Sequence, residues 1–223
     1  DGAGWPDIAG SLAAVDRRGS AANVAALLPH GTIRLNVVGA DDRPASAAEL
    51  AAMRAEVERG MHDGAFGLSA GLTYAPGMFA DTAELVALCA IVAAHGGYFA
   101  PHQRSYGAGA LTGYAEMIEI ARRAACALHL THATMNFAVN RGRAAELVAL
   151  IDDALAGGVD ITLDTYPYLP GSTTLAALLP GWAAAGGPEP TLARLRDPAA
   201  RAQIIHELDV VGSDGAHGVP VDW

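Results

Sequence analysis

The chain has 223 residues, is 52% hydrophobic and carries a formal net charge of −10. This length is enough for one sizeable hydrophobic core or two small ones. The negative charge argues against a nucleic-acid partner, whose backbone is bound by clustered Lys and Arg. No apolar run is long enough to cross a membrane, so no membrane partner is expected. All 14 basic residues are Arg, which excludes a Lys nucleophile and a carboxylated-lysine metal bridge within this chain.

The cysteine content favours a reducing compartment. Cys89 and Cys126 lie in apolar segments and are expected to be reduced core residues rather than a disulfide. The first residues lack the basic region of a signal peptide. We therefore expect a cytoplasmic protein.

Short apolar runs alternate with amphipathic segments along the chain. A capping box of Ser46 and Glu49 predicts that a helix begins there. Strands are expected at 32–38, 66–69, 98–102, 127–132, 160–164 and 210–213. Helices are expected at 46–64, 81–96, 111–125, 147–157 and 197–208. This alternation predicts βαβ units and a parallel sheet.

Six such units are two strands short of a closed (β/α)₈ barrel. Either the sheet is open, or two strands lie outside this chain. The helix expected to end at Leu208 leads into the strand at 210–213 with no turn residues between them. Because αβ loops usually need about 2–6 residues, we expect residues to be missing near Asp209. Otherwise residues 1–223 are interpreted as one partial barrel domain.

Three candidate site residues each end an apolar run. His102, His132 and Asp214 follow the runs at 98–101, 127–131 and 210–213. The carboxyl ends of parallel strands meet at one edge of the sheet, where alternating α/β folds build catalytic and metal sites. Imidazole and carboxylate groups at that edge indicate a metal-dependent hydrolase.

Seven segments extend this pattern over nearly the whole chain. The most specific reads Gly-Leu-Ser-x-Gly-Leu-x-Tyr-x-Pro-Gly over residues 67–77. The segments are 30–34, 64–77, 100–104, 130–132, 164–168, 171–173 and 212–215. Taken in order, they resemble the N-acyl-D-amino-acid deacylase (D-aminoacylase) branch of the amidohydrolase superfamily.

The resemblance implies a TIM-like (β/α)₈ amidohydrolase barrel, of which this chain supplies the third to eighth strands. It implies that His102 and His132 are Zn²⁺ ligands and that Asp214 is the catalytic acid–base. Positions that contact the substrate in such enzymes are matched by Tyr74, Tyr166 and Ser172. The family's first-strand His-x-His pair and second-strand cysteine are not in this chain. We therefore expect the chain alone to bind zinc weakly or not at all, and its activity alone is left open.

The implied reaction is zinc-dependent hydrolysis of an N-acyl-D-amino acid to a D-amino acid and a carboxylate. Zinc would lower the pKa of its bound water to about 7, and Asp214 would carry the proton to the leaving amine. Two alternatives remain. One is a cyclic-amide hydrolase of the hydantoinase or dihydroorotase kind. The other is a non-catalytic scaffold without the first metal ligands.

Other titratable residues receive structural interpretations. His129 lies three positions from His132 and is expected on the opposite face of its strand. His30 is expected in a turn before its strand, and Asp164 in a hydrogen-bonding role. His217 is left open between a supporting position and disorder. Histidines expected to be solvated or paired with a helix dipole are His62, His95 and His206.

Overall fold

One parallel sheet organises the molecule. The computed structural model describes residues 7–168, 170–215 and 217–222. Five strands pair in the order β1-β2-β3-β4-β5, every pair parallel. They are β1 (Leu27–Pro29), β2 (Gly67–Gly71), β3 (Tyr98–His102), β4 (Ala127–Leu130) and β5 (Ile161–Leu163). The predicted parallel α/β architecture is confirmed, and the described strands form an open sheet.

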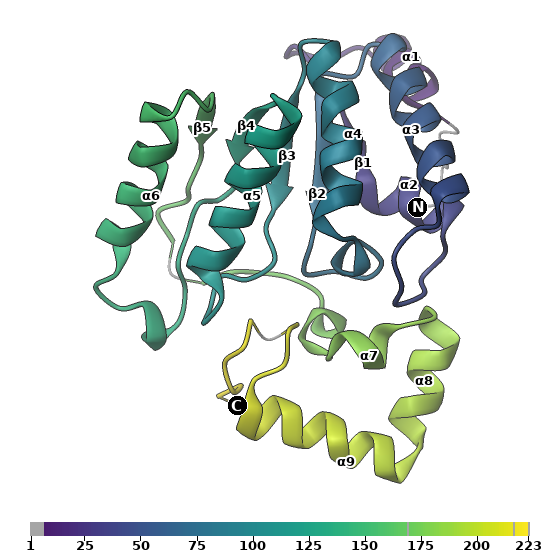
Figure 1. The fold of residues 1–223 in the computed structure, drawn as a ribbon. Coiled ribbons are helices and arrows are strands. Elements are labelled where there is room, and N and C mark those ends of the chain that lie inside the picture. Colours follow the sequence, from purple (N-terminus) through teal and green to yellow (C-terminus); the bar gives the residue numbers. More distant parts are fainter. Residues whose placement is uncertain (1–6, 169, 216, 223) are drawn as a thin grey trace.

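Helices connect the strands and cover one face of the sheet (Figure 1). The predicted helices correspond to α3 (Ala47–His62), α4 (Thr82–Ala94), α5 (Ala110–Ala124), α6 (Ala144–Ala156) and α9 (Pro198–His206). Helices not predicted from the sequence are α1 (Ile8–Arg18), α2 (His30–Val37), α7 (Gly181–Ala184) and α8 (Pro188–Arg196). Short 3₁₀ turns occupy η1 (Gly77–Phe79), η2 (Ala138–Asn140) and η3 (Leu175–Leu178). No helix in the described ranges is both long and apolar enough to span a bilayer.

The core lies between the sheet and its helices. Strand side chains that alternate toward the helices, such as Leu68, Phe99 and Leu128, are almost fully buried. Cys89 and Cys126 are free and buried in this layer, as predicted. Burial raises the pKa of the Cys89 thiol.

The strand expected at 32–38 is wrong. These residues lie mostly in α2, and the strand is instead β1, just before them. The buried residues of α2 are His30, Ile33 and Arg34, whereas Leu35 is 49% exposed. That spacing of three and four residues is helical. It places the His30 and Arg34 side chains on the face that meets a buried carboxylate, so tertiary pairing overrides the strand preference of the β-branched residues.

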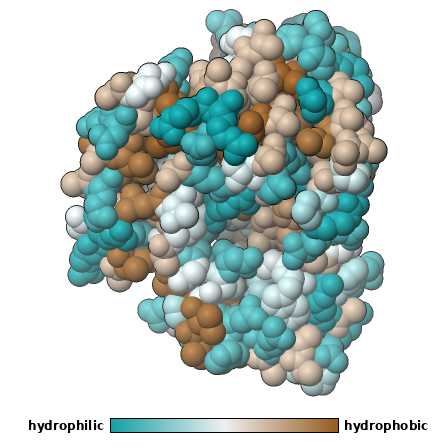
Figure 2. Space-filling view, viewed as in Figure 1, coloured by the Kyte–Doolittle hydropathy of each residue, from teal (hydrophilic) through white to brown (hydrophobic). Residues whose placement is uncertain are grey.

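The strand expected at 210–213 is also wrong. The chain leaves α9 through a π-helical turn, η4 (Glu207–Val211), which the Gly212 N–H closes on the Glu207 carbonyl at 2.8 Å. With no turn residues to reverse the chain, the helical hydrogen bonding simply continues. Val210 and Val211 remain about 60% exposed, and Figure 2 shows hydrophobic surface near the end of α9. Missing residues near Asp209 stay a prediction.

The helices after β5 form a smaller lobe. Figure 1 shows α7, α8, α9 and the C-terminal segment below the carboxyl ends of the strands. This lobe has its own small core of Ala183, Ile204 and Leu208. The part of the chain that was expected to return to the sheet therefore packs outside it.

The predicted capping box at the start of α3 is confirmed and gives a first test. Ser46 Oγ accepts from the Glu49 N–H at 3.3 Å, and the Ser46 N–H donates to Glu49 Oε2 at 2.8 Å. We expect Ser46→Ala to lower the free energy of unfolding by about 1 kcal/mol, measured by urea denaturation. Ser46→Thr, which keeps the hydroxyl, is the control. Equal stability of all three proteins would show that the cap contributes nothing.

Candidate metal and active site

Two histidines meet at the carboxyl edge of the sheet. His102 is the last residue of β3, and His132 lies just beyond the end of the neighbouring β4. His102 Nδ1 is 3.1 Å from His132 Nε2, with the rings nearly perpendicular. The structure thus brings together the two residues that the sequence predicted to be neighbours. Their role as metal ligands stays a prediction.

The His102 imidazole is held in place and kept neutral. Its Nε2 shares a hydrogen bond of 2.8 Å with Thr73 Oγ1, which lies in the loop after β2. Burial, followed by the nearby His132 and His217, lowers the pKa of His102 to about 3. At neutral pH this ring is therefore uncharged and has one unprotonated nitrogen, which is the state that metal binding requires.

The His132 backbone is fixed by the next strand. His132 has a φ of +38°, a conformation that non-glycine residues seldom adopt. The Asp164 carboxylate, just after β5, accepts the His132 backbone N–H, and the Asp164 carbonyl accepts from Ala133 at 2.7 Å. His129 Nε2 lies 3.0 Å from Asp164 Oδ2, and this bond lowers the pKa of the Asp164 carboxyl. The hydrogen-bonding interpretation of Asp164 and the structural interpretation of His129 are therefore confirmed, and together the two residues fix the backbone at His132.

Tyrosines surround the histidine pair. The Tyr74 ring lies 5.0 Å from His102, and its hydroxyl is 3.0 Å from Thr173 Oγ1. The exposed Ser172 is next to Thr173, so its loop approaches the pair through Tyr74. The Tyr166 ring centroid is 6.5 Å from that of His132. Tyr74 and Tyr166 thus lie near the pair, and Ser172 adjoins a residue that contacts Tyr74. Contact of all three with a substrate stays a prediction.

Tyr106 is a site residue that the sequence analysis missed. Its ring centroid lies 4.8 Å from that of His102 and 5.1 Å from that of His132. The buried hydroxyl accepts the Gln103 N–H at 3.1 Å, and burial raises its pKa. His217 packs behind Tyr106 at 5.7 Å, which resolves its open assignment in favour of a supporting position. The only sequence signal was the position of Tyr106 four residues after His102.

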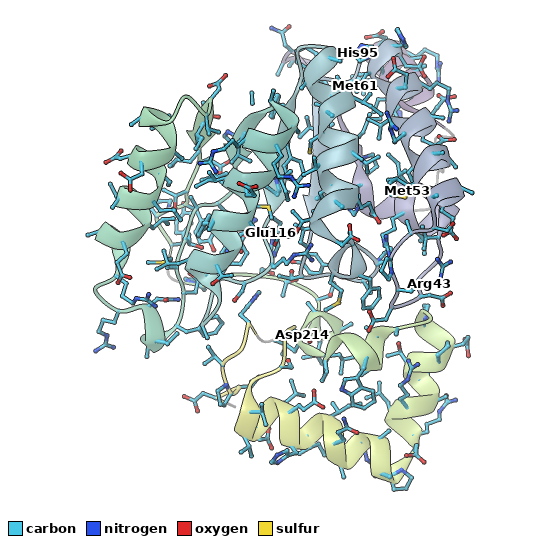
Figure 3. All side chains as sticks on the ribbon, in the orientation of Figure 1. Arg43, Met53, Met61, His95, Glu116 and Asp214 are labelled. Atoms are coloured by element: carbon cyan, nitrogen blue, oxygen red, sulfur yellow. The ribbon has the colours of Figure 1, made fainter. Side chains whose placement is uncertain are left out.

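Asp214 does not join the histidines in the described structure. Its Oδ1 accepts the N–H groups of Gly181 at 2.8 Å and Gly215 at 2.9 Å. Figure 3 places it in the lobe below the strands. No group of three ligand atoms within 4.8 Å of one another combines it with His102 and His132 among the described residues. The physical reason is that the strand expected to deliver it is the π-helical turn. Its catalytic role stays a prediction.

A buried charged cluster lies beside the site. His30 follows β1 directly and is fully buried, so its expected place in a turn before a strand is wrong. Its Nε2 is 2.8 Å from Glu84 Oε1, and the Arg34 guanidinium pairs with the other carboxylate oxygen. His30 also lines a cavity of about 480 Å³ with Tyr74 at the carboxyl ends of β1 and β2. The helical spacing of His30 and Arg34 was the signal available in the sequence.

Several known proteins are similar to this chain in sequence and in fold. No protein-family profile matches the chain. An N-acyl-D-glutamate deacylase of Alcaligenes xylosoxydans xylosoxydans is 37% identical over 171 residues, which are 77% of this chain and 35% of that protein. A D-aminoacylase of the same organism is 36% identical over 156 residues, or 70% of this chain and 32% of that protein. The chain spans about a third of the length of the curated relatives it matches.

Solved structures similar to this chain are also deacylases of these kinds. The N-acyl-D-glutamate deacylase of Bordetella bronchiseptica, complexed with zinc and a phosphonate mimic of the reaction's tetrahedral intermediate, superposes with a TM-score of 0.70 at 34% identity. The match covers 73% of this chain and 34% of that one. A D-aminoacylase superposes with a TM-score of 0.71 at 33% identity, over 74% and 35% of the two chains.

A parallel α/β sheet with paired histidines at its carboxyl edge, together with these likenesses, defines an amidohydrolase fold. Over about three quarters of its length the chain is similar in sequence and fold to the N-acyl-D-amino-acid deacylase (D-aminoacylase) family.

Proposed function

We propose that this chain forms part of the active site of a zinc-dependent N-acyl-D-amino-acid deacylase. The reaction is hydrolysis of the amide bond, which releases a D-amino acid and a carboxylate. The observation that carries the proposal is the 3.1 Å approach of His102 Nδ1 to His132 Nε2 at the carboxyl ends of neighbouring strands. The deacylases among its relatives support the reaction class.

The histidine pair fits a zinc ion. Two nitrogen ligands at the usual zinc distance and tetrahedral angle lie about 3.3 Å apart, close to the separation observed here. The depressed pKa of His102 keeps its imidazole neutral. His102 and His132 would therefore hold the ion, which supplies Lewis acidity toward the amide carbonyl and toward a water molecule.

The chain's own residues position the reaction. Thr73 orients the His102 ring, and Asp164 fixes the backbone at His132. We assign proton transfer to Asp214, which takes a proton from the attacking water and gives it to the leaving amine. Its Oδ1 is occupied by backbone N–H donors, so Oδ2 is assigned to the proton. Substrate contacts are assigned to Tyr74, Tyr166 and Ser172.

An activity panel tests the proposal. The assay uses a zinc-loaded enzyme that contains this chain together with the family's His-x-His and cysteine ligands. We expect release of D-amino acid from N-acetyl-D-glutamate, N-acetyl-D-aspartate or a neutral N-acetyl-D-amino acid, with the N-acetyl-L-amino acids as controls. A chelator should abolish the rate and added zinc should restore it, because the ion activates both reactants.

Two outcomes would contradict the proposal. Turnover of hydantoin or dihydroorotate without turnover of any N-acyl-amino acid would identify a cyclic-amide hydrolase. A folded protein that holds no zinc and hydrolyses neither class would identify a non-catalytic scaffold.

A further inference from the structure

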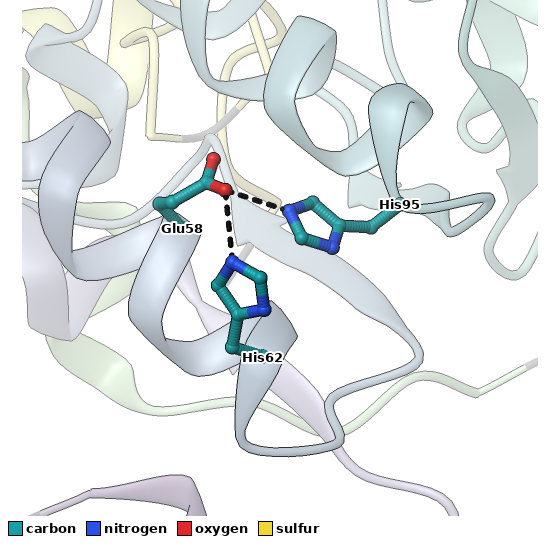
Figure 4. Close-up of side chains that lie close together, drawn as sticks. All are labelled: Glu58, His62 and His95. Atoms are coloured by element: carbon teal, nitrogen blue, oxygen red, sulfur yellow. Dashed lines mark hydrogen bonds and ion pairs between the residues drawn. The ribbon is translucent and has the colours of Figure 1, made fainter.

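A second group of metal-type ligands lies far from the histidine pair. Figure 4 shows Glu58, His62 and His95, whose ligand atoms all lie within 4.8 Å of one another. Glu58 Oε1 is 3.2 Å from His62 Nε2 and 2.9 Å from His95 Nε2. The two imidazole rings meet edge to face with centroids 4.7 Å apart. Both histidines therefore direct their Nε2 atoms at one carboxylate oxygen.

The surroundings of this cluster favour a cation. Glu58 and His62 are one turn apart at the end of α3, and His95 is the C-cap residue of α4. The C-terminal end of a helix carries a partial negative charge, and here two such ends converge. The Glu58 carboxylate adds a full negative charge, because its hydrogen bond from His95 lowers its pKa.

The cluster lies at the edge of the sheet opposite to the proposed active site. α3 and α4 end just before β2 and β3 begin, so these residues lie near the amino ends of the strands. Figure 3 shows His95 at the top of the molecule and Asp214 well below it, beneath the carboxyl ends of the strands. In barrels of this architecture the amino edge contributes to stability and the carboxyl edge to catalysis. A ligand here would therefore affect stability rather than the reaction.

We propose that Glu58, His62 and His95 form a structural site for a divalent transition-metal ion, for which zinc is the fitting probe. Two imidazole nitrogens and one carboxylate oxygen are a donor set that zinc uses in proteins. On binding, the proton on each Nε2 moves through solvent to Nδ1 of the same ring, or is released if the ring is protonated; the freed Nε2 atoms and Glu58 then ligate the ion, and water completes the coordination. Because α3 supplies two ligands and α4 supplies one, the ion links the ends of these helices.

Without a bound ion, the ion pairs of Glu58 with His62 and His95 are expected to add little to the free energy of unfolding. Glu58 and His62 are half-exposed or more, and exposed pairs contribute little to stability. A bound ion stabilises the folded chain by a free energy that grows with the logarithm of the ion concentration relative to its dissociation constant. The proposal stands apart from the deacylase assignment, since it shares no residue with it.

Zinc titration of the 223-residue chain, labelled with ¹⁵N in its histidine rings, tests the site. The decisive variant is His62→Gln, because His62 is 69% exposed and its replacement leaves the core untouched. The control is His206→Gln, an exposed histidine at the end of α9. Calorimetry counts the zinc equivalents, the imidazole resonances locate them, and thermal unfolding reports their effect.

We expect zinc to shift the His62 and His95 resonances and to raise the midpoint of thermal unfolding. His62→Gln should remove one equivalent or weaken it by more than about tenfold, in line with the sensitivity of metal sites to lost ligands. His206→Gln should bind like the unsubstituted chain. The proposal is overturned if the His62 and His95 resonances do not respond to zinc, or if His62→Gln binds with unchanged stoichiometry and affinity.

Discussion

Asp214→Asn is expected to lower the deacylation rate by about 10²–10⁴-fold while the fold stays intact. The asparagine side-chain oxygen can still accept the N–H groups of Gly181 and Gly215, which hold Oδ1 of the aspartate. The amide cannot take a proton from water, so the substitution separates the chemical role of Asp214 from its structural one.

The measurement is the rate of the zinc-loaded enzyme, with unfolding followed separately by circular dichroism. Asp197→Asn is a matched control, since Asp197 caps α9 in the same lobe through the Ala200 N–H at 2.7 Å. Asparagine preserves that cap, so this variant should keep its activity. If Asp214→Asn retains more than about a tenth of the rate, Asp214 is a loop cap and another group moves the proton.

Glu84→Ala should produce the largest loss of stability in the chain, about 3–5 kcal/mol. Glu84 is 3% exposed, and its carboxylate bridges the fully buried side chains of His30 and Arg34. Removal of the carboxylate leaves the Arg34 charge buried without its partner. That loss is comparable to the whole free energy of unfolding of many domains, about 5–15 kcal/mol.

Urea denaturation measures this loss, with Glu146→Ala as the control. Glu146 forms an exposed ion pair with Arg143 on α6, and removal of such a pair costs at most about 1 kcal/mol. Glu84→Gln keeps the shape of the side chain and provides a folded variant if Glu84→Ala does not fold. The prediction is contradicted if both Glu84 variants lower the free energy of unfolding as little as Glu146→Ala does. The cluster of Glu84 with His30 and Arg34 would then not stabilise the junction of β1, α2 and α4.

Local patterns in the sequence were enough to predict most of the sheet. Strands β2 to β5 follow from short apolar runs, and α3 follows from the capping box of Ser46 and Glu49. The meeting of His102 and His132 also follows, because neighbouring parallel strands carry their last residues to one edge. In each case the information lies within a few residues or in one repeated unit.

Tertiary contacts decided the remainder. Residues 32–38 became mostly helical because His30 and Arg34 pair with Glu84, which is 54 positions from His30. Residues 210–213 could form a strand only beside another strand, and the described chain packs them in the smaller lobe. The Tyr106 contacts and the Glu58–His62–His95 cluster depend in the same way on loops or helices meeting in space. A pattern within the sequence records which residues prefer burial or a given backbone conformation, whereas the identity of the partner is set only when distant segments pack together.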